Sequence, residues 1–315
     1  MPADIIVTAP LPDFLSEPLK RDYRVHDYHQ ASDKPGLLAA EGPRIHALVQ
    51  GGGNVAPVDL LDKLPALEII SVFGVGYDGV PVDYCRKRGI KVTNTPDVLT
   101  DDVADVAVGL VLMTSRGFAR LERFARAGDW LKRGPELTTK VGGKTVGILG
   151  LGRIGKAIAQ RLTAMGMKIA YTGRKPQTDV PYRFVADLTT LASEVDFLIV
   201  ACPGGAATKN LVGSEVLAAL GRKGTLVNIA RGSIVDEPAL VAALQAGTIK
   251  AAGLDVFVDE PNVPPALLTM DNVVVLPHVG SATRETRQAM GDLCKANLDA
   301  WFRESRTLTL IPELG

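Results

Sequence analysis

The sequence predicts an α/β protein built from two parallel-sheet domains. Three observations lead to this fold class. Short apolar segments alternate with helical patterns along almost all of the 315 residues. Most of these segments are apolar on both faces, which is typical of parallel strands covered by helices on two sides. The segments are about twice as many as one doubly wound sheet needs, so two domains are expected.

The predicted strands fall into two groups along the chain. The first group comprises residues 4–9, 23–26, 47–50, 67–72 and 91–95, and the second comprises residues 145–149, 168–171, 196–201, 226–229, 251–256 and 272–276. Each group is expected to form a Rossmann-like or flavodoxin-like sheet, with a cleft between the two domains.

The boundary between the two groups is expected near Thr95-Pro96. An apolar helical pattern then runs over residues 99–117 and opens with Thr100-Asp101-Asp102, which is good N-cap chemistry. A second helix is predicted from residue 282 to about residue 303, after the last strand. If that helix returns to the first domain, the domains are residues 1–97 plus 283–315 and residues 98–282.

Composition and charge argue against several classes of protein. The 35 basic residues balance the 35 acidic ones, so no overall field favours nucleic acid or an anionic membrane. Cys85, Cys202 and Cys294 show no metal-ligand spacing, so no metal is expected, and their sparse use fits a reducing compartment. The N-terminus lacks the pattern of a signal peptide, and no apolar run is long enough to span a bilayer. We therefore expect a cytoplasmic protein.

A glycine-rich fingerprint follows the strand at residues 145–149. It reads Gly150-Leu151-Gly152-Arg153-Ile154-Gly155 and leads into a helical pattern. Gly150 permits a tight turn, Gly152 lets a pyrophosphate approach the backbone, and Gly155 allows helix and strand to pack closely. The helix N-terminus offers N–H groups to the phosphates. Such a motif is weak evidence alone but strong between a buried strand and a helix, where a purely structural turn is the lesser alternative.

The end of the next predicted strand suggests which dinucleotide binds. An NAD enzyme usually carries an acid roughly 20 residues past the fingerprint, to bind the ribose 2′-hydroxyl. This chain has Gly173 there, followed by Arg174 and Lys175, with no acid over residues 163–178. An arginine can hold the 2′-phosphate of NADP in bidentate fashion. The sequence thus favours NADP(H), with NAD(H) as a weaker cofactor, unless both cations are merely solvated.

Three polar residues follow predicted strands in the last third of the chain. They are Arg231 in Asn228-Ile229-Ala230-Arg231-Gly232, Glu260 in Asp259-Glu260-Pro261, and His278 in Pro277-His278-Val279-Gly280. Ligands bind at the carboxyl edge of parallel sheets. Hydride transfer to a ketone needs a proton donor for the developing alkoxide and a cation for the neighbouring carboxylate, and these residue types supply both. His26, His29 and His46 have no such context and are interpreted as structural or surface residues.

Over nearly its whole length the chain resembles the D-isomer-specific 2-hydroxyacid dehydrogenase family. The resemblance rests on Gly-Leu-Gly-Arg-Ile-Gly, Asn-Ile-Ala-Arg-Gly and Pro-His-Val-Gly-Ser-Ala-Thr together. Within the family the sequence is most similar to the NADPH-dependent glyoxylate/hydroxypyruvate reductases and to the hydroxyphenylpyruvate reductases. The implied activity is reduction of small 2-oxo acids to D-2-hydroxy acids, with residues 98–282 binding NADP and the other domain binding substrate.

The resemblance also implies roles for single residues. His278 would be the general acid, Glu260 would fix its tautomer, and Arg231 would orient and polarise the substrate. The amides of Val75 and Gly76 would hold the substrate carboxylate in an anion-binding nest. Together with the fingerprint and the basic pair, the expected cofactor-binding residues are Gly150, Gly152, Arg153, Ile154, Gly155, Gly173, Arg174, Lys175, Cys202, Pro203, Ala230, Asp255, His278 and Gly280.

Family members are usually homodimers, in which the segment around residues 118–135 reaches the partner. Because the local sequence diverges there, Trp130 is left out of the predicted site, and the turn at Gly51-Gly52-Gly53 is equally well interpreted as a plain loop or as part of the cleft. Alternative functions are a hydroxyphenylpyruvate or 2-ketogluconate reductase, another dehydrogenase of the family, or a cofactor-sensing corepressor. A formate dehydrogenase would lack Glu260, and a corepressor would need a peptide-binding surface that the sequence does not indicate.

Overall fold

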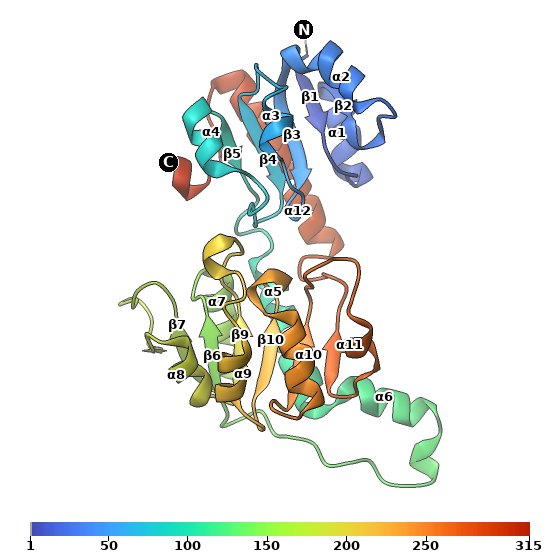
Figure 1. Cartoon of the computed structure of the whole chain (residues 1–315), viewed down its shortest axis with the longest axis vertical. Helices are drawn as coiled ribbons and strands as arrows, with labels where there is room; N and C mark the ends of the chain where they lie inside the picture. The colour runs from blue at the N-terminus through green and yellow to red at the C-terminus, as the bar shows by residue number, and fades with distance from the viewer. Residues whose placement is uncertain (1) are drawn as a thin grey trace. The chain divides into compact units, whose positions relative to one another are not determined.

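The computed structural model of the chain describes residues 2–315, which form two compact units (Figure 1). Unit 1 combines the residues up to Leu99 with Thr283–Gly315, and unit 2 is Thr100–Ala282. Each unit contains one sheet, and every strand pairing in both sheets is parallel over the part of the chain that is described. The predicted fold class, two parallel-sheet α/β domains, is confirmed.

Unit 1 holds a five-stranded sheet of order β2-β1-β3-β4-β5. Its strands are β1 (Asp4–Val7), β2 (Arg24–Asp27), β3 (Ile45–Gly51), β4 (Ile69–Phe73) and β5 (Lys91–Thr93). Its helices are α1 (Asp13–Asp22), α2 (Lys34–Glu41), α3 (Val58–Leu61), α4 (Val82–Arg88) and α12 (Arg284–Glu304), with 3₁₀ turns η1 (Tyr28–Gln30), η2 (Gly42–Arg44) and η6 (Pro312–Leu314). Helix α12 packs on β4 and beside α1, so both ends of the chain build this unit.

Unit 2 holds a seven-stranded sheet of order β12-β11-β10-β9-β6-β7-β8. Its strands are β6 (Thr145–Leu149), β7 (Lys168–Thr172), β8 (Arg183–Phe184), β9 (Phe197–Val200), β10 (Thr225–Asn228), β11 (Ala251–Leu254) and β12 (Val273–Val275). Its helices are α5 (Thr100–Arg116), α6 (Phe118–Arg126), α7 (Arg153–Ala164), α8 (Leu188–Ser193), α9 (Ser214–Leu220), α10 (Glu237–Gln245) and α11 (Pro265–Thr269), with 3₁₀ turns η3 (Asp129–Leu131), η4 (Ala206–Thr208) and η5 (Gly232–Ile234). The strand order reverses between β6 and β9, which is where a doubly wound sheet binds its ligand.

Each predicted strand range overlaps an observed strand, and the helices predicted over residues 99–117 and 282–303 correspond to α5 and α12. Strand β8 is not predicted by the sequence pattern. It has only two residues, and Arg183 is exposed at the edge of the sheet. A strand of this length cannot show the periodicity by which strands are recognised.

Helix α6 and the segment after it project from the body of unit 2 (Figure 1). None of the residues of α6 is buried. The following segment exposes large apolar side chains, with Leu131 94% exposed and Leu137 100% exposed. Large apolar side chains that stay exposed in their own chain gain nothing from the hydrophobic effect as they stand.

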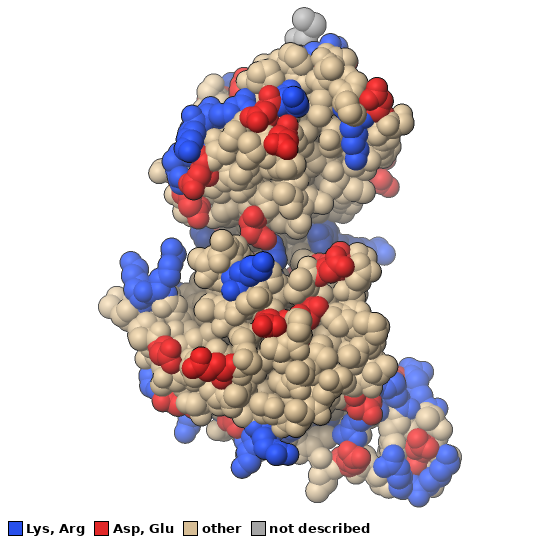
Figure 2. All heavy atoms as spheres, viewed as in Figure 1, with Lys and Arg blue, Asp and Glu red and all other residues tan. Residues whose placement is uncertain are grey.

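Basic and acidic side chains are interspersed over the face shown in Figure 2. This distribution agrees with the balanced charge of the sequence. Among residues 2–315, no helix combines the length and the apolar character that a membrane span requires.

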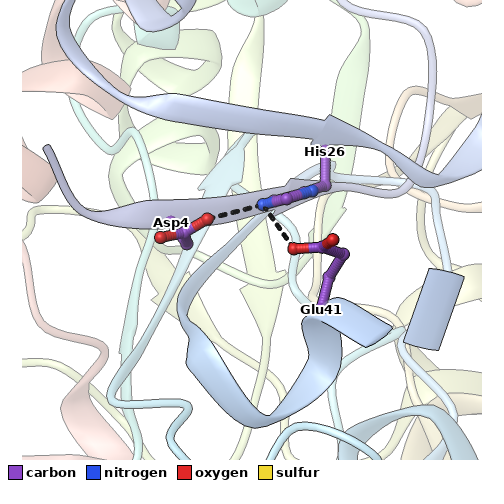
Figure 3. Close-up of side chains that lie close together, drawn as sticks. All are labelled: Asp4, His26 and Glu41. Atoms are coloured by element: carbon purple, nitrogen blue, oxygen red, sulfur yellow. Dashed lines mark hydrogen bonds and ion pairs between the residues drawn. The ribbon is translucent and has the colours of Figure 1, made fainter. Parts of the chain in front are cut away.

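A cluster of charged side chains lies beside the start of β1 in unit 1 (Figure 3). His26 Nε2 lies 2.7 Å from Asp4 Oδ1 and 3.9 Å from Glu41 Oε2. Arg44 pairs with both carboxylates, and Arg24 lies 3.8 Å from Asp4. Because the guanidinium groups already provide positive charge, the cluster is best described as an ion-pair network of the fold.

Candidate active site

The fingerprint turn between β6 and α7 is tightly packed at two of its glycines and open at the third. Gly150 has φ +97°, and a Cβ placed on it would lie 2.7 Å from the Cys202 backbone. A Cβ on Gly155 would lie 2.2 Å from the Gly150 carbonyl oxygen, so helix and strand pack too closely for a side chain. A Cβ on Gly152 would meet no described atom within 4 Å. The Gly152 side of the turn is therefore the open one, and α7 begins there without a side-chain cap.

The end of β7 exposes three residues in succession, Gly173, Arg174 and Lys175. Within residues 2–315, neither Arg174 nor Lys175 has a hydrogen-bond or ion-pair partner. The space around Gly173 is open, because a Cβ there would contact no described atom within 4 Å. Two neighbouring cations without counter-charges suit an anionic ligand such as a 2′-phosphate.

The turn that carries Arg231 is held by Asn228, the last residue of β10. Asn228 is buried, its Nδ2 donates to the Arg231 carbonyl oxygen at 2.9 Å, and its Oδ1 accepts from the Ala230 N–H at 3.1 Å. The sequence prediction did not assign Asn228 a role. Its signal was a lone amide inside an apolar strand, because a buried amide must find partners and here finds them in the turn.

Glu260 and His278 form a close pair after β11 and β12. The Nδ1 atom of His278 lies 2.6 Å from Oε2 of Glu260, while Oε1 accepts the Phe257 N–H at 3.0 Å. Burial alone would raise the pKa of Glu260. The hydrogen bonds from His278 and Phe257 and the positive charge of Arg231 outweigh it, so the pKa of this carboxyl is lowered. Glu260 is therefore ionised at neutral pH and can stabilise an imidazolium.

Asp255 holds the backbone beside His278. Its Oδ1 accepts the Val279 N–H at 2.7 Å and its Oδ2 accepts the Gly280 N–H at 2.8 Å. The side chain is buried, and burial raises the pKa of the carboxyl despite these two hydrogen bonds. Asp255 thus fixes the turn in which His278 adopts φ +53°. Its expected contact with the cofactor stays a prediction.

Gly232 brings the Arg231 turn against the segment that leads to Glu260. A Cβ on Gly232 would lie 2.0 Å from the carbonyl carbon of Phe257 and 2.3 Å from the Val258 nitrogen. This close backbone contact places Arg231 and Glu260 in adjacent turns of unit 2. The effect of the Arg231 charge on the pKa of Glu260 is consistent with this proximity.

Cys202 and Pro203 follow β9 and adjoin the fingerprint turn through the contact of Cys202 with Gly150. Burial raises the pKa of the Cys202 thiol to about 11. A thiol with this pKa is protonated at neutral pH, which argues for packing against the turn and against a nucleophile.

Val75 and Gly76 belong to unit 1 and follow β4. Their turn is held by Asn94, which donates to the Val75 carbonyl oxygen at 2.8 Å. A Cβ on Gly52 would lie 2.9 Å from the Gly76 carbonyl oxygen and 3.2 Å from the Gly74 Cα. The triple-glycine turn therefore packs backbone to backbone against the predicted carboxylate-binding turn.

Several known proteins are similar to this chain in sequence and in fold. Residues 108–280 match the family model described as "D-isomer specific 2-hydroxyacid dehydrogenase, NAD binding domain". The chain is 44% identical over 305 residues to a hydroxyphenylpyruvate reductase of Plectranthus scutellarioides, and equally so to glyoxylate/hydroxypyruvate reductase A of Arabidopsis thaliana, with 97% of each chain covered. It is also similar to the NADPH-dependent glyoxylate/hydroxypyruvate reductase of Sinorhizobium meliloti, solved with NADP and malonate. That match has a TM-score of 0.92 and 44% identity, covering 100% of this chain and 98% of the other.

Proposed function

Because this chain belongs to the D-isomer specific 2-hydroxyacid dehydrogenase family, we propose that it reduces small 2-oxo acids with NADPH, yielding D-2-hydroxy acids. Glyoxylate and hydroxypyruvate are the proposed substrates, as the names of its relatives suggest. The observation that carries the proposal is the 2.6 Å contact between His278 Nδ1 and an ionised Glu260, with the Arg231 turn packed alongside.

The chemistry requires one hydride and one proton. NADPH, when bound, supplies the hydride to the carbonyl carbon. His278 holds a proton on Nδ1 against Glu260, so the proton given to the developing alkoxide comes from Nε2 of the imidazolium. Glu260 stabilises the imidazolium before transfer, and Asp255 keeps the histidine turn in place. The neutral imidazole that remains is the base for the reverse reaction.

Substrate orientation is proposed for Arg231 together with Val75 and Gly76. The Arg231 guanidinium would bind the carboxylate and polarise the neighbouring carbonyl group. The backbone N–H groups of Val75 and Gly76 would hold the same carboxylate, as an anion-binding nest does. Unit 1 would thus supply the substrate nest, and residues 98–282 would supply the cofactor site.

The preference for NADPH over NADH is proposed on the two unpartnered cations Arg174 and Lys175. A carboxylate at the position of Gly173 would repel a 2′-phosphate, and none is present. The fingerprint glycines, with Arg153 and Ile154, would bind the pyrophosphate. Cys202, Pro203, Ala230, Asp255, His278 and Gly280 would line the remainder of the cofactor site.

We further propose a cytoplasmic homodimer in which the projecting arm around α6 packs on a second copy of the chain. The exposed side chains of Trp130, Leu131 and Leu137 would become buried there. Sedimentation or light scattering gives the mass in solution. A monomer at micromolar concentration would argue against this part of the proposal.

The activity is tested by steady-state kinetics with a panel of 2-oxo acids that includes glyoxylate, hydroxypyruvate, hydroxyphenylpyruvate and 2-ketogluconate. Each substrate is assayed with NADPH and with NADH at equal concentration. We expect the highest kcat/KM for glyoxylate or hydroxypyruvate with NADPH. A clear preference for one of the larger acids would redirect the substrate assignment, and equal rates with NADH would refute the cofactor preference.

A further inference from the structure

We infer that Gln177 is a positioning residue for cofactor selection: it ties the segment carrying Arg174 and Lys175 to the fingerprint turn. The inference rests on the proposed NADPH preference and adds the device that holds the two cations in place. Gln177 lies outside the motifs that the sequence analysis assigned to the cofactor.

Two hydrogen bonds of Gln177 make the connection. Its Nε2 donates to the carbonyl oxygen of Leu151 at 2.8 Å, and Leu151 lies between the first two glycines of the fingerprint. Its backbone N–H donates to the Tyr171 hydroxyl oxygen at 2.7 Å. One residue thus joins the turn that would bind the pyrophosphate to the end of the strand that leads to the basic pair.

The partners of Gln177 are themselves fixed. Tyr171 is a buried residue of β7, and its ring packs on Phe184 with centroids 5.4 Å apart. Two residues beyond Gln177, Asp179 pairs with Lys156 in α7 at 2.6 Å. The hydrogen bond from Lys156 lowers the pKa of Asp179, so this carboxylate is ionised and neutralised by its partner. The segment from residue 173 to residue 179 is therefore held at two points, by Gln177 on the fingerprint turn and by Asp179 on α7.

These two contacts matter because Arg174 and Lys175 are not held by contacts of their own. Arg174 and Lys175 are exposed and make no hydrogen bond or ion pair with residues 2–315. A bidentate guanidinium contact depends on how well the group is placed in advance. Without the bond to Leu151, the segment would sample more conformations, and binding a 2′-phosphate would carry the entropic cost of ordering it.

The test measures binding of 2′,5′-ADP and of 5′-AMP to the full-length protein by calorimetry, which needs no turnover. Gln177→Met keeps the length of the side chain and removes its donor. We expect this variant to bind 2′,5′-ADP about tenfold more weakly, which corresponds to about 1.4 kcal/mol, while its affinity for 5′-AMP changes less than about twofold. Tyr171→Phe removes the other acceptor and should shift the same ratio in the same direction. Gln245→Met, an exposed glutamine in α10, is the matched control and should leave both affinities unchanged.

The outcomes separate this inference from the proposal beneath it. If the wild-type protein binds both nucleotides equally, the proposed NADPH preference is refuted, and the role of Gln177 is refuted as well. If the wild type prefers 2′,5′-ADP and Gln177→Met keeps that preference, only the role of Gln177 is refuted. An equal loss of affinity for both nucleotides also refutes it, because it would indicate general damage to the nucleotide site.

Discussion

The carboxylate of Glu260 contacts the imidazole of His278 through a hydrogen bond of 2.6 Å between Oε2 and Nδ1. The other carboxylate oxygen, Oε1, accepts the Phe257 N–H, so both sides of the carboxylate are engaged. This fixes the orientation of the ring and reserves Nε2 for a ligand. A second pair of the same kind, His46 and Glu68, lies in unit 1 at 3.0 Å. The side chains of His46 and Glu68 are 40% and 46% exposed, similar to the 41% and 34% of His278 and Glu260. The pair in unit 1 is therefore a matched comparison for the pair in unit 2.

The first prediction concerns His278 as the proton donor. His278→Ala should lower kcat by about 10²- to 10⁴-fold, the usual contribution of a general acid. The dissociation constant for NADPH, measured by fluorescence titration, should change by less than about threefold, because binding rests mainly on the fingerprint. His46→Ala is the matched control and should keep full activity. Retained turnover in His278→Ala would overturn the assignment.

The second prediction concerns Glu260 and pH. Because its pKa is lowered, the stabilising interaction of this carboxylate is present above its unfolded pKa and is lost only as pH falls through the lower folded value. Glu260→Gln removes the charge at every pH. In the wild type the reduction rate should fall at acid pH as Glu260 becomes protonated, and this acid-side decline should be absent from the variant. At neutral pH we expect a loss in kcat of about tenfold or more. A profile identical to that of the wild type would contradict the role given to Glu260.

The sequence was sufficient for every strand except the two-residue β8, and for placing Arg231, Glu260 and His278 after strands, because these features have local signals. Buried strands are apolar on two faces, and parallel strands place their carboxyl ends on one edge. It was insufficient where function depends on contacts between distant segments. In the sequence, Gly232 cannot be distinguished from other loop glycines. Only the structure shows how close it lies to the Phe257 carbonyl carbon. No periodicity or motif in the sequence predicts the hydrogen bonds of Gln177 with Leu151 and Tyr171.

The third prediction concerns Gly173 and cofactor choice. The position has open space and no left-handed backbone, so Gly173→Asp should fold without strain. The new carboxylate would face the cations Arg174 and Lys175 and would repel a 2′-phosphate. We expect kcat/KM for NADPH to fall about 10- to 100-fold, which corresponds to about 1.4 to 2.8 kcal/mol. The kcat/KM for NADH should rise. Gly173→Asn tests shape without charge and should change the ratio much less. An unchanged ratio in Gly173→Asp would remove this position from the cofactor site.

The fourth prediction concerns Gly232, where backbone meets backbone. Gly232→Ala would place a methyl group 2.0 Å from the Phe257 carbonyl carbon, and main-chain atoms cannot rotate away as a side chain would. The Arg231 and Glu260 turns must then separate. Overpacking of this kind costs about 1–3 kcal/mol of the free energy of unfolding, which urea unfolding measures. Because the two turns move apart, kcat/KM should fall as well. Gly247→Ala is the control for a loop glycine with open space; its left-handed backbone should lower stability while leaving kcat/KM unchanged. If Gly232→Ala is as stable and as active as the wild type, the two turns are not coupled.

The fifth prediction concerns the ion-pair network around Asp4 in unit 1. Burial would raise the pKa of this carboxyl, but the hydrogen bond with His26 and the charges of Arg24 and Arg44 leave it lowered. A lowered folded pKa means that Asp4 stabilises the protein above its unfolded pKa and that this contribution is lost as pH falls through the folded value. Asp4→Asn should therefore reduce the free energy of unfolding at neutral pH, by about 1.5–3 kcal/mol for hydrogen bonds to a charged group. The difference from the wild type should begin to shrink in urea titrations as pH falls below about 3.9, the usual pKa of Asp, and should vanish only below the lower folded value, where Asp4 is neutral as well. Glu17→Gln, at an exposed position of α1, should change stability by less than about 0.5 kcal/mol at either pH. A difference between Asp4→Asn and the wild type that grows on acidification would show that Asp4 is not held in its ionised form by the network.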